Sequence, residues 1–227
     1  MHPPLPPCPD PERYILVKTR EGNFWRLKRG LKKVAVLNAK MLEHAGHLSV
    51  SSKAASRMVQ VLRPHLCGLS PGRINTRFSS FLHKSLARFG KADYTFFNDY
   101  DLQKTNPLSS LINKVPLVKR EEDKIGLLFS WPLRMDMLVT KNQIINGFEF
   151  SAILLYGDPC RDECPAVTSV ISPVYLPRTK EADCALWLQI PPGNQSWILF
   201  CKVSCFEDNA PAHHSKHYAM KVMAVNG

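Results

Sequence analysis

The spacing of apolar residues changes character near Gly90, and this change constrains the fold more than any other feature of the chain. Before Gly90, apolar residues recur with the spacing of a buried helix face. After about residue 125, they recur in short β-branched and aromatic runs separated by Pro, Gly, Asn and Asp. The sequence therefore predicts an α+β protein in which a helical part precedes an antiparallel β-sandwich.

Two helices are predicted between residues 31 and 64. The first covers about residues 31–45, and Gly46 is well placed to end it. The second begins at Ser51 or Ser52, whose hydroxyls suit an N-cap, and ends or kinks at Pro64. The apolar residues expected to face inward are Leu31, Val34, Leu37, Met41, Leu42 and Ala45 in the first helix, and Ala55, Met58, Val59 and Leu62 in the second.

A third helix is the clearest of the three. Ser70 can cap it, Pro71 suits its first turn, and Gly90 can close it. The inward residues expected of the third helix are Ile74, Phe78, Phe81, Leu82, Leu86 and Phe89.

Upstream of the helices, residues 14–17 and 24–27 flank a Glu-Gly-Asn turn, which predicts a small hairpin.

About seven strands are predicted after residue 125, separated by turn signals such as Asn146-Gly147. Within residues 196–206, alternate positions are apolar on both faces, which predicts a central strand that is covered on both sides. The candidate ranges are 125–130, 133–140, 144–156, 167–175, 183–190, 196–206 and 217–225.

These patterns divide the chain into four segments. A flexible Pro-rich tail at residues 1–12 precedes a basic helical domain at residues 13–92. Residues 93–124 form a linker or transition, and the β-sandwich domain covers residues 125–227. Inside the transition, the sequence predicts a strand at 94–97, a short helical turn at 107–113 and a solvated linker at 119–124.

Positive charge is concentrated in the helical part. Between Arg13 and Lys91 there are 17 Lys or Arg residues and only two acidic ones, Glu21 and Glu43, which is a formal charge of +15. The rest of the chain is −4, and the total is +11. A surface of one sign attracts polyanions and repels copies of itself.

The third predicted helix carries its basic residues along one side. At about 100° per residue, five of them fall within an arc of about 60°, away from the apolar arc. The stripe is about 27 Å long, which matches about eight phosphates along one strand. The second helix adds Lys53, Arg57 and Arg63, and the first adds Lys32, Lys33 and Lys40. The candidate nucleic-acid-binding residues are Arg73, Arg77, Lys84, Arg88, Lys91, Lys53 and Arg57.

Three interpretations of this stripe remain open. The guanidinium group of Arg can bond two phosphate oxygens at once, which favours nucleic acid or another polyanion as the partner. An acidic protein surface would meet the same charges, and a plain solvated face would need no partner. Residues 64–70 are longer than the turn of a helix-turn-helix motif, which favours contact with the nucleic-acid backbone over reading of bases.

The cysteines favour a structural role. Residues four apart in a strand lie about 13 Å from each other, so Cys201 and Cys205 cannot share one metal ion. Together with Cys184 they are expected to be buried free thiols. Cys160 and Cys164 lie in a predicted loop, where they could pair with each other.

The one histidine cluster is formed by His213, His214 and His217. Imidazoles this close could hold a metal or act in acid–base chemistry, but the nearest carboxylate is Asp208, so a polar loop is the preferred interpretation. No catalytic, P-loop or dinucleotide motif is present in the sequence. The protein is therefore predicted not to be an enzyme, with no metal and no cofactor.

The cellular setting is predicted from two features. Seven cysteines is an odd number, which points to a reducing compartment. The sequence has no run of the roughly 18–20 apolar residues that a membrane-spanning helix needs, and its first residues lack the features of a secretory signal. A cytoplasmic protein without a membrane partner is expected.

Three short motifs carry a family resemblance: Ser56-Arg57 in the second helix, Arg77 after Asn75 in the third, and Gly147-Phe148-Glu149-Phe150 in a strand. In these motifs and in the order of its elements, about half of the chain resembles a group of uncharacterised bacterial proteins with a short helical segment before an immunoglobulin-like β-sandwich. The resemblance implies an immunoglobulin-like sandwich and no known activity or site.

Together these observations predict a non-enzymatic binding protein whose basic helical face contacts nucleic acid through the backbone, largely independently of sequence. The alternative is a structural or assembly subunit of a phage-like or other multimeric particle, in which the sandwich makes protein–protein contacts or the protein associates with itself.

Overall fold

The computed structural model describes residues 7, 10–19, 22–28, 38–131, 145–159, 165–176, 179, 182–193 and 196–226. The chain divides into two compact units, residues 1–44 and residues 45–227. The first unit contains an antiparallel hairpin of β1 (Tyr14–Thr19) and β2 (Gly22–Leu27), in which Tyr14 pairs with Leu27. The hairpin predicted from the sequence is thus confirmed.

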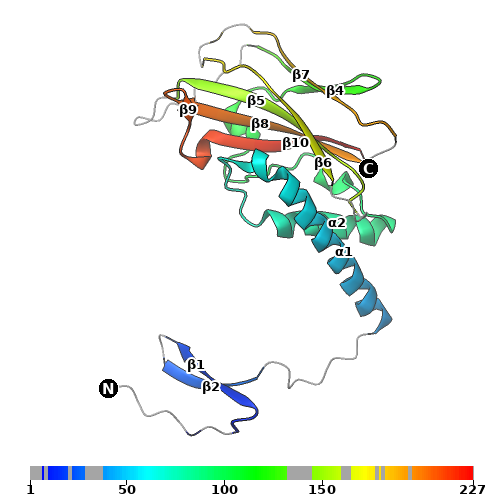
Figure 1. The fold of residues 1–227 in the computed structure, drawn as a ribbon, viewed down its shortest axis with the longest axis vertical. Coiled ribbons are helices and arrows are strands. Elements are labelled where there is room, and N and C mark those ends of the chain that lie inside the picture. The colour runs from blue at the N-terminus through cyan, green and yellow to red at the C-terminus, as the bar shows by residue number, and fades with distance from the viewer. Residues whose placement is uncertain are drawn as a thin grey trace. The chain divides into compact units, whose positions relative to one another are not determined.

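Helices and two antiparallel sheets build the second unit, which confirms the α+β class (Figure 1). The larger sheet has the order β10-β8-β5-β6, with β9 paired to the end of β8, and the smaller has the order β3-β4-β7. The strands are β3 (Leu117–Arg120), β4 (Lys124–Phe129), β5 (Gly147–Tyr156), β6 (Ala166–Ile171), β7 (Cys184–Gln189), β8 (Trp197–Glu207), β9 (Ala210–Pro211) and β10 (Tyr218–Asn226). The helices are α1 (Ala39–Leu62), which begins in the first unit, α2 (Ile74–Phe89), α3 (Leu108–Leu111) and the 3-10 turns η1 (Arg63–Leu66), η2 (Thr95–Phe97) and η4 (Ser215–His217).

The larger sheet is covered on both faces. One face shares a core with the smaller sheet and α3, and the other shares a core with α1, α2 and residues 92–102. Alternation along β8 follows this division, because Leu199, Cys201 and Val203 lie in the first core while Ile198 and Phe200 lie in the second. The prediction of a central strand covered on both sides is confirmed.

Aromatic side chains of α2 pack against those of the segment that follows it. The rings of Phe78 and Phe81 each lie 5.0 Å from the ring of Phe97, in edge-to-face contact. Phe78 and Phe97 are fully buried, and Tyr94 beside them donates a hydrogen bond to the Gly157 carbonyl at 3.0 Å. Burial of each such ring contributes about 1.5–3 kcal/mol, so this cluster fixes how α2 sits on the sheet.

The two helices predicted at residues 31–45 and from Ser51 onward are corrected to one. Residues 31–37 lie outside the described residues, and α1 runs without interruption from Ala39 through Gly46 to Leu62. Its N-cap is Asn38, whose Oδ1 accepts a hydrogen bond from the Met41 amide at 2.9 Å. Ser51 is not a cap: it is buried, and its hydroxyl donates to the Leu48 carbonyl.

Replacement of Gly46 by alanine is expected to raise the free energy of unfolding by about 0.5–1 kcal/mol, because Gly is a poor residue inside a helix. An added Cβ at Gly46 would meet no atom within 4 Å. Thermal unfolding of the full chain checks this. A lower unfolding temperature in the variant would mean that Gly46 ends a helix, as the sequence alone predicts.

The predicted end of α2 is confirmed, but its predicted beginning is wrong. Gly90 adopts the left-handed conformation, and its amide donates to the Leu86 carbonyl. The N-cap is Arg73 rather than Ser70, whose amide instead donates to Gln103 Oε1. Phe89, predicted to face inward, is the last residue of α2 and is 45% exposed, with its ring 6.1 Å from that of Phe96.

Two further predictions between residues 93 and 124 are corrected. Residues 95–97 form the turn η2 rather than a strand, and residues 119–124 form the end of β3, the hairpin turn and the start of β4 rather than a linker. The helical turn at 107–113 is confirmed as α3. Six of the seven predicted strands are found, and the seventh, at 133–140, lies outside the described residues. The division of the chain into domains at residues 12, 92 and 124 stays a prediction.

Candidate nucleic-acid interface

The segment from Ala45 to Ala92 contains eight Lys or Arg residues and no Asp or Glu. It covers most of α1, the connector that includes η1, and all of α2. Six of the eight basic residues are exposed: Lys53, Arg63, Arg73, Lys84, Arg88 and Lys91. All seven basic residues singled out from the sequence lie in this segment, and we call the exposed part of residues 45–92 the acid-free helical surface.

The α2 part of this surface has a single basic side. Arg73, Lys84 and Arg88 are exposed and lie within about 60° of one another around the helix axis. Thr76 and Ser80, which are exposed on the same helix, carry hydroxyl groups that can also bond phosphate oxygens. The first turn of α2 contains no carboxylate, so its amide dipoles add to the positive potential.

Arg77 is held differently from its neighbours. Its guanidinium group donates hydrogen bonds to the Tyr100 hydroxyl at 3.1 Å and to the Leu102 carbonyl at 3.4 Å, and the side chain is half-buried. Guanidinium has five N–H donors, so some of them remain available to a ligand. Arg77 therefore joins α2 to residues 100–102 as well as contributing charge.

Lys53 and Arg57 belong to a different helix. Lys53 lies about 160° around α1 from the buried Ser51, so it points away from the packed side, and Arg57 is half-buried. The two helices meet where the Ser51 and Ser79 hydroxyls lie 3.4 Å apart and where the His47 and His83 rings lie 6.1 Å apart. The structure thus brings Arg73, Lys84 and Arg88 together on α2 and places the two α1 residues on a separate side.

No carboxylate of the described residues neutralises the exposed charges. The ion pairs among the described residues all lie outside this segment and join Arg13 to Asp10, Lys119 to Glu121, and Lys221 to Asp99 and Asp101. The first acid after α2 is Asp93, which is buried and accepts hydrogen bonds from the Ser85 hydroxyl and the Thr95 amide. Its charge is therefore directed inward, away from the helical surface.

A buried lysine on β8 anchors the connector between α1 and α2. Lys202 is only 8% exposed, and its Nζ donates to the Cys67 carbonyl at 2.9 Å. Beside it, the ring of Tyr218 packs against the backbone of Gly68, which has a φ of +80°. Burial lowers the pKa of Lys202. Lys202 therefore fixes the connector that sets where the two basic helices begin and end.

Other titratable groups surround this anchor. Burial raises the pKa of Glu149, although Lys202 and a hydrogen bond from Ser204 act in the opposite direction. Burial, and then the positive charge of Lys202, lower the pKa of His65. Nothing in the sequence pattern marks these residues as a group, except that Lys202 and Ser204 interrupt an apolar face of a covered strand.

Acidification is expected to reduce stability through two histidines. The pKa of His65 and that of His217 are lowered below 6.5, mainly by burial, so the folded state binds fewer protons than the unfolded state just below that value. The unfolding temperature should therefore fall from about pH 7.5 to about pH 5.5, and the fall should be smaller in the double variant His65→Gln, His217→Gln. The raised pKa of Glu149 acts in the opposite direction in both proteins. Equal falls in the two proteins would contradict the assignment.

The prediction of buried free thiols is confirmed for the three cysteines named from the sequence, whereas the predicted polar histidine loop contains a buried histidine. Cys184, Cys201 and Cys205 are buried free thiols, and burial raises the pKa of Cys205 to about 12. Cys160 and Cys164 lie outside the described residues. His217 is buried at the end of η4, and the rings of His214 and His217 are 6.5 Å apart. In the described part of the chain, no group of three or more His, Cys, Asp or Glu is placed to bind a metal.

The chain matches no protein-family model, no curated protein and no solved structure. None of the helices in the described ranges is both long enough and apolar enough to cross a bilayer.

Proposed function

We propose that the protein is a non-enzymatic binding protein that contacts nucleic acid, or another polyanion, through its acid-free helical surface. The observation that carries the proposal is the combination of eight basic residues with no acidic one from Ala45 to Ala92. A solvated face without a partner normally carries both positive and negative side chains. Side chains of one sign repel each other, and this repulsion destabilises the folded state.

The dimensions of α2 support contact with a phosphate backbone. Its 16 residues span about 24 Å, which is the length of about seven phosphates along one strand. Arg73, Lys84 and Arg88 follow this length on one side. Phosphate contacts of this kind position a protein on nucleic acid and carry no sequence information, so binding should be largely independent of sequence.

The affinity for an oligonucleotide is expected to fall steeply with salt. If about six phosphates are neutralised, the logarithm of the association constant should fall against the logarithm of salt concentration with a slope of about −5. Fluorescence anisotropy of a labelled duplex and of a labelled single strand measures this slope. Binding that ignores salt, or no binding at low salt, would contradict the proposal.

A second candidate is an assembly subunit of a multimeric particle. Its specific support is a set of exposed apolar side chains on β3, on β6 and in the segments next to these strands, where a neighbouring subunit could cover them: Val115, Leu117, Ile171, Val174 and Leu176. Size-exclusion chromatography with light scattering separates the candidates. A discrete large oligomer without bound nucleic acid favours assembly, and a monomer favours the first candidate.

We also propose that the two sheets form an immunoglobulin-like sandwich. The support is the strand order: counting β3, β4, β5, β6, β7, β8 and β10 in turn, the first, second and fifth strands form one sheet, and the seventh, sixth, third and fourth form the other. Immunoglobulin sandwiches divide their first, second, third, fifth, sixth and seventh strands in this way, and the sheet that holds the third strand can accept an additional one beside it. Free thiols at Cys184, Cys201 and Cys205 suit a reducing, cytoplasmic setting.

A further inference from the structure

The smaller sheet presents an unusual outer face. Along β4 and β7, Ile125, Leu127, Leu186 and Leu188 are buried in the core between the sheets, so the alternate residues face outward. The strand register places Lys119, Gly126 and Trp187 side by side on that outer face. A half-buried tryptophan therefore stands on a sheet face that no element of the described chain covers.

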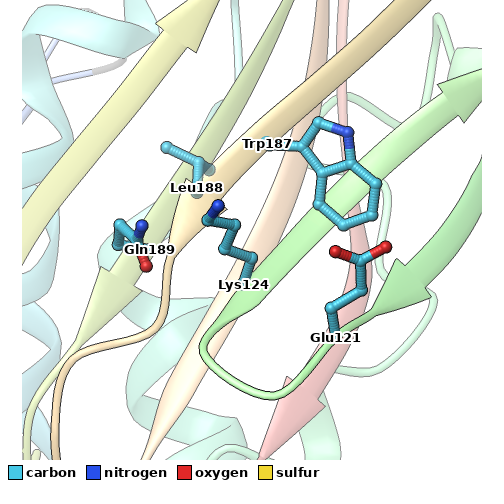
Figure 2. Close-up of a pocket in the computed structure, with 5 residues that line it drawn as sticks. All are labelled: Glu121, Lys124, Trp187, Leu188 and Gln189. Carbon is cyan, nitrogen blue, oxygen red and sulfur yellow. The ribbon is translucent and has the colours of Figure 1, made fainter.

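Gly126 supports the indole of Trp187. A Cβ added at Gly126 would lie 2.7 Å from Trp187 Cε3 and 2.8 Å from Cδ2, so the ring rests directly on the glycine backbone. One face of the indole is thereby held against the sheet. Figure 2 shows the two fused rings in full view, with the carboxylate of Glu121 pointing toward them.

A hollow of about 210 Å³ lies beside this ring, lined by Glu121, Lys124, Trp187, Leu188 and Gln189. Drug-sized ligands occupy pockets of about 300–1,000 Å³, so this hollow suits a single small ring. Its polar groups differ in kind: the Glu121 carboxylate accepts hydrogen bonds and the Lys124 ammonium donates them. With the Gln189 amide turned to the orientation that satisfies its neighbours, its nitrogen donates to the Asp123 carbonyl at 2.9 Å and to Asp123 Oδ2 at 3.1 Å, which leaves its oxygen to accept.

Two other ligand classes fit this chemistry less well. A cation would have to replace Lys119, whose Nζ already lies 5.8 Å from the Trp187 ring centroid and 3.1 Å from Glu121 Oε1. A nucleotide could stack its base on the indole, but its phosphate would approach the carboxylates of Glu121, Glu122 and Asp123 in the adjacent turn. A neutral ring with hydroxyl groups is not repelled by these carboxylates and need not supply a charge in place of Lys119, because hydroxyls can donate to a carboxylate and accept from an ammonium.

We propose that the Trp187 platform, formed by Trp187 on Gly126 with Glu121, Lys124 and Gln189 around it, binds a single pyranose ring of a neutral carbohydrate. The C–H face of the sugar lies on the indole, and its hydroxyls bond Glu121 and Lys124. The exposed Lys119–Glu121 ion pair is of a weakly stabilising kind, so the sugar displaces it easily. This site is separate from the helical surface and does not depend on the proposed function.

Saturation-transfer difference NMR on the full chain, with the methyl glycosides of glucose, galactose and mannose, tests the proposal. At least one glycoside should bind with a dissociation constant of about 1 mM, as expected of one ring on an open site. Binding should weaken at least about tenfold in Trp187→Ala and also in Glu121→Gln, a variant that leaves the indole in place. Leu117→Ala, an exposed residue on the same sheet face, is the matched control and should bind as the original protein does.

Three results would overturn the proposal. The first is the absence of saturation transfer to any of the glycosides. The second is unchanged binding in both Trp187→Ala and Glu121→Gln. The third is transfer to a nucleoside such as uridine that is stronger than to every glycoside and is lost in Trp187→Ala, because that result would assign the platform to base stacking instead.

Discussion

Replacing Arg73, Lys84 and Arg88 together with glutamine is expected to weaken oligonucleotide binding about 100-fold at about 0.15 M salt. Each phosphate contact releases close to one counterion, which is equivalent to about a fivefold gain in affinity at that salt concentration. The three residues are exposed, lie on one side of α2 and form no ion pair with any described residue. The slope of the salt dependence should also decrease in magnitude, from about 5 to about 2.

The matched control changes the same net charge elsewhere. Lys104, Lys114 and Lys216 are exposed and lie outside the helical surface, so the triple variant with glutamine at these positions should lose only a few-fold in affinity, through the weaker overall field. Fluorescence anisotropy at four or more salt concentrations measures both variants. If both triple variants lose affinity equally, binding depends on total charge, and the helical surface is not the interface.

Replacing Gly68 with alanine is expected to lower the free energy of unfolding by about 3 kcal/mol. Two effects act together. Gly68 has a φ of +80°, which strains any residue with a Cβ, and the added Cβ would overlap the ring of Tyr218. Tyr218 cannot move aside without losing the hydrogen bond from its hydroxyl to the Ala212 carbonyl, at 2.7 Å. For a chain of this length the loss corresponds to a fall of about 10 °C in the unfolding temperature, measurable by calorimetry.

Gly193 provides the control for backbone strain alone. Its φ is +92°, but a Cβ added there would meet no atom within 4 Å. Gly193→Ala should therefore lower the free energy of unfolding by only about 1–2 kcal/mol. Similar effects at the two positions would mean that the contact between Tyr218 and the connector does not restrain Gly68.

Much of the fold can be predicted from the sequence because alternation and helical spacing are local. The β8 pattern was sufficient to predict that Leu199 and Phe200 lie on opposite, covered faces of the strand, and Gly90 was sufficient to predict the end of α2. The errors come from competition between local and tertiary effects. Gly46 favours a helix end, but the Asn38 cap and the packing of the helix beyond Ser51 favour continuity, and a single glycine costs only about 1 kcal/mol.

Tertiary packing also explains the errors after α2. Tyr94 and Phe97 are aromatic residues typical of strands, yet their rings fill the space between α2 and the larger sheet, where a turn fits and a strand does not. The run of charges at 119–124 resembles a linker because the sequence does not show that Glu121 and Lys124 exchange backbone hydrogen bonds across a two-residue turn.

The positive charge of the candidate site could be predicted from the sequence, but the contacts that hold its helices in place could not. Basic residues on one helix side follow from spacing, which placed Arg73, Lys84 and Arg88 together. The anchoring of the connector by Lys202 depends on a contact between residues 135 positions apart, and no local pattern encodes it. The hydrogen bonds of Arg77 to Tyr100 and Leu102 are likewise a product of the fold.

Lysine acetylation tests most directly whether the acid-free helical surface is the interface. The rate is measured at each lysine by mass spectrometry, with and without a saturating oligonucleotide. Nucleic acid should slow the modification of Lys84 and Lys91 several-fold and leave the rates at Lys104, Lys114 and Lys216 unchanged. Protection of the second set alone, or equal protection of both sets, would contradict the assignment.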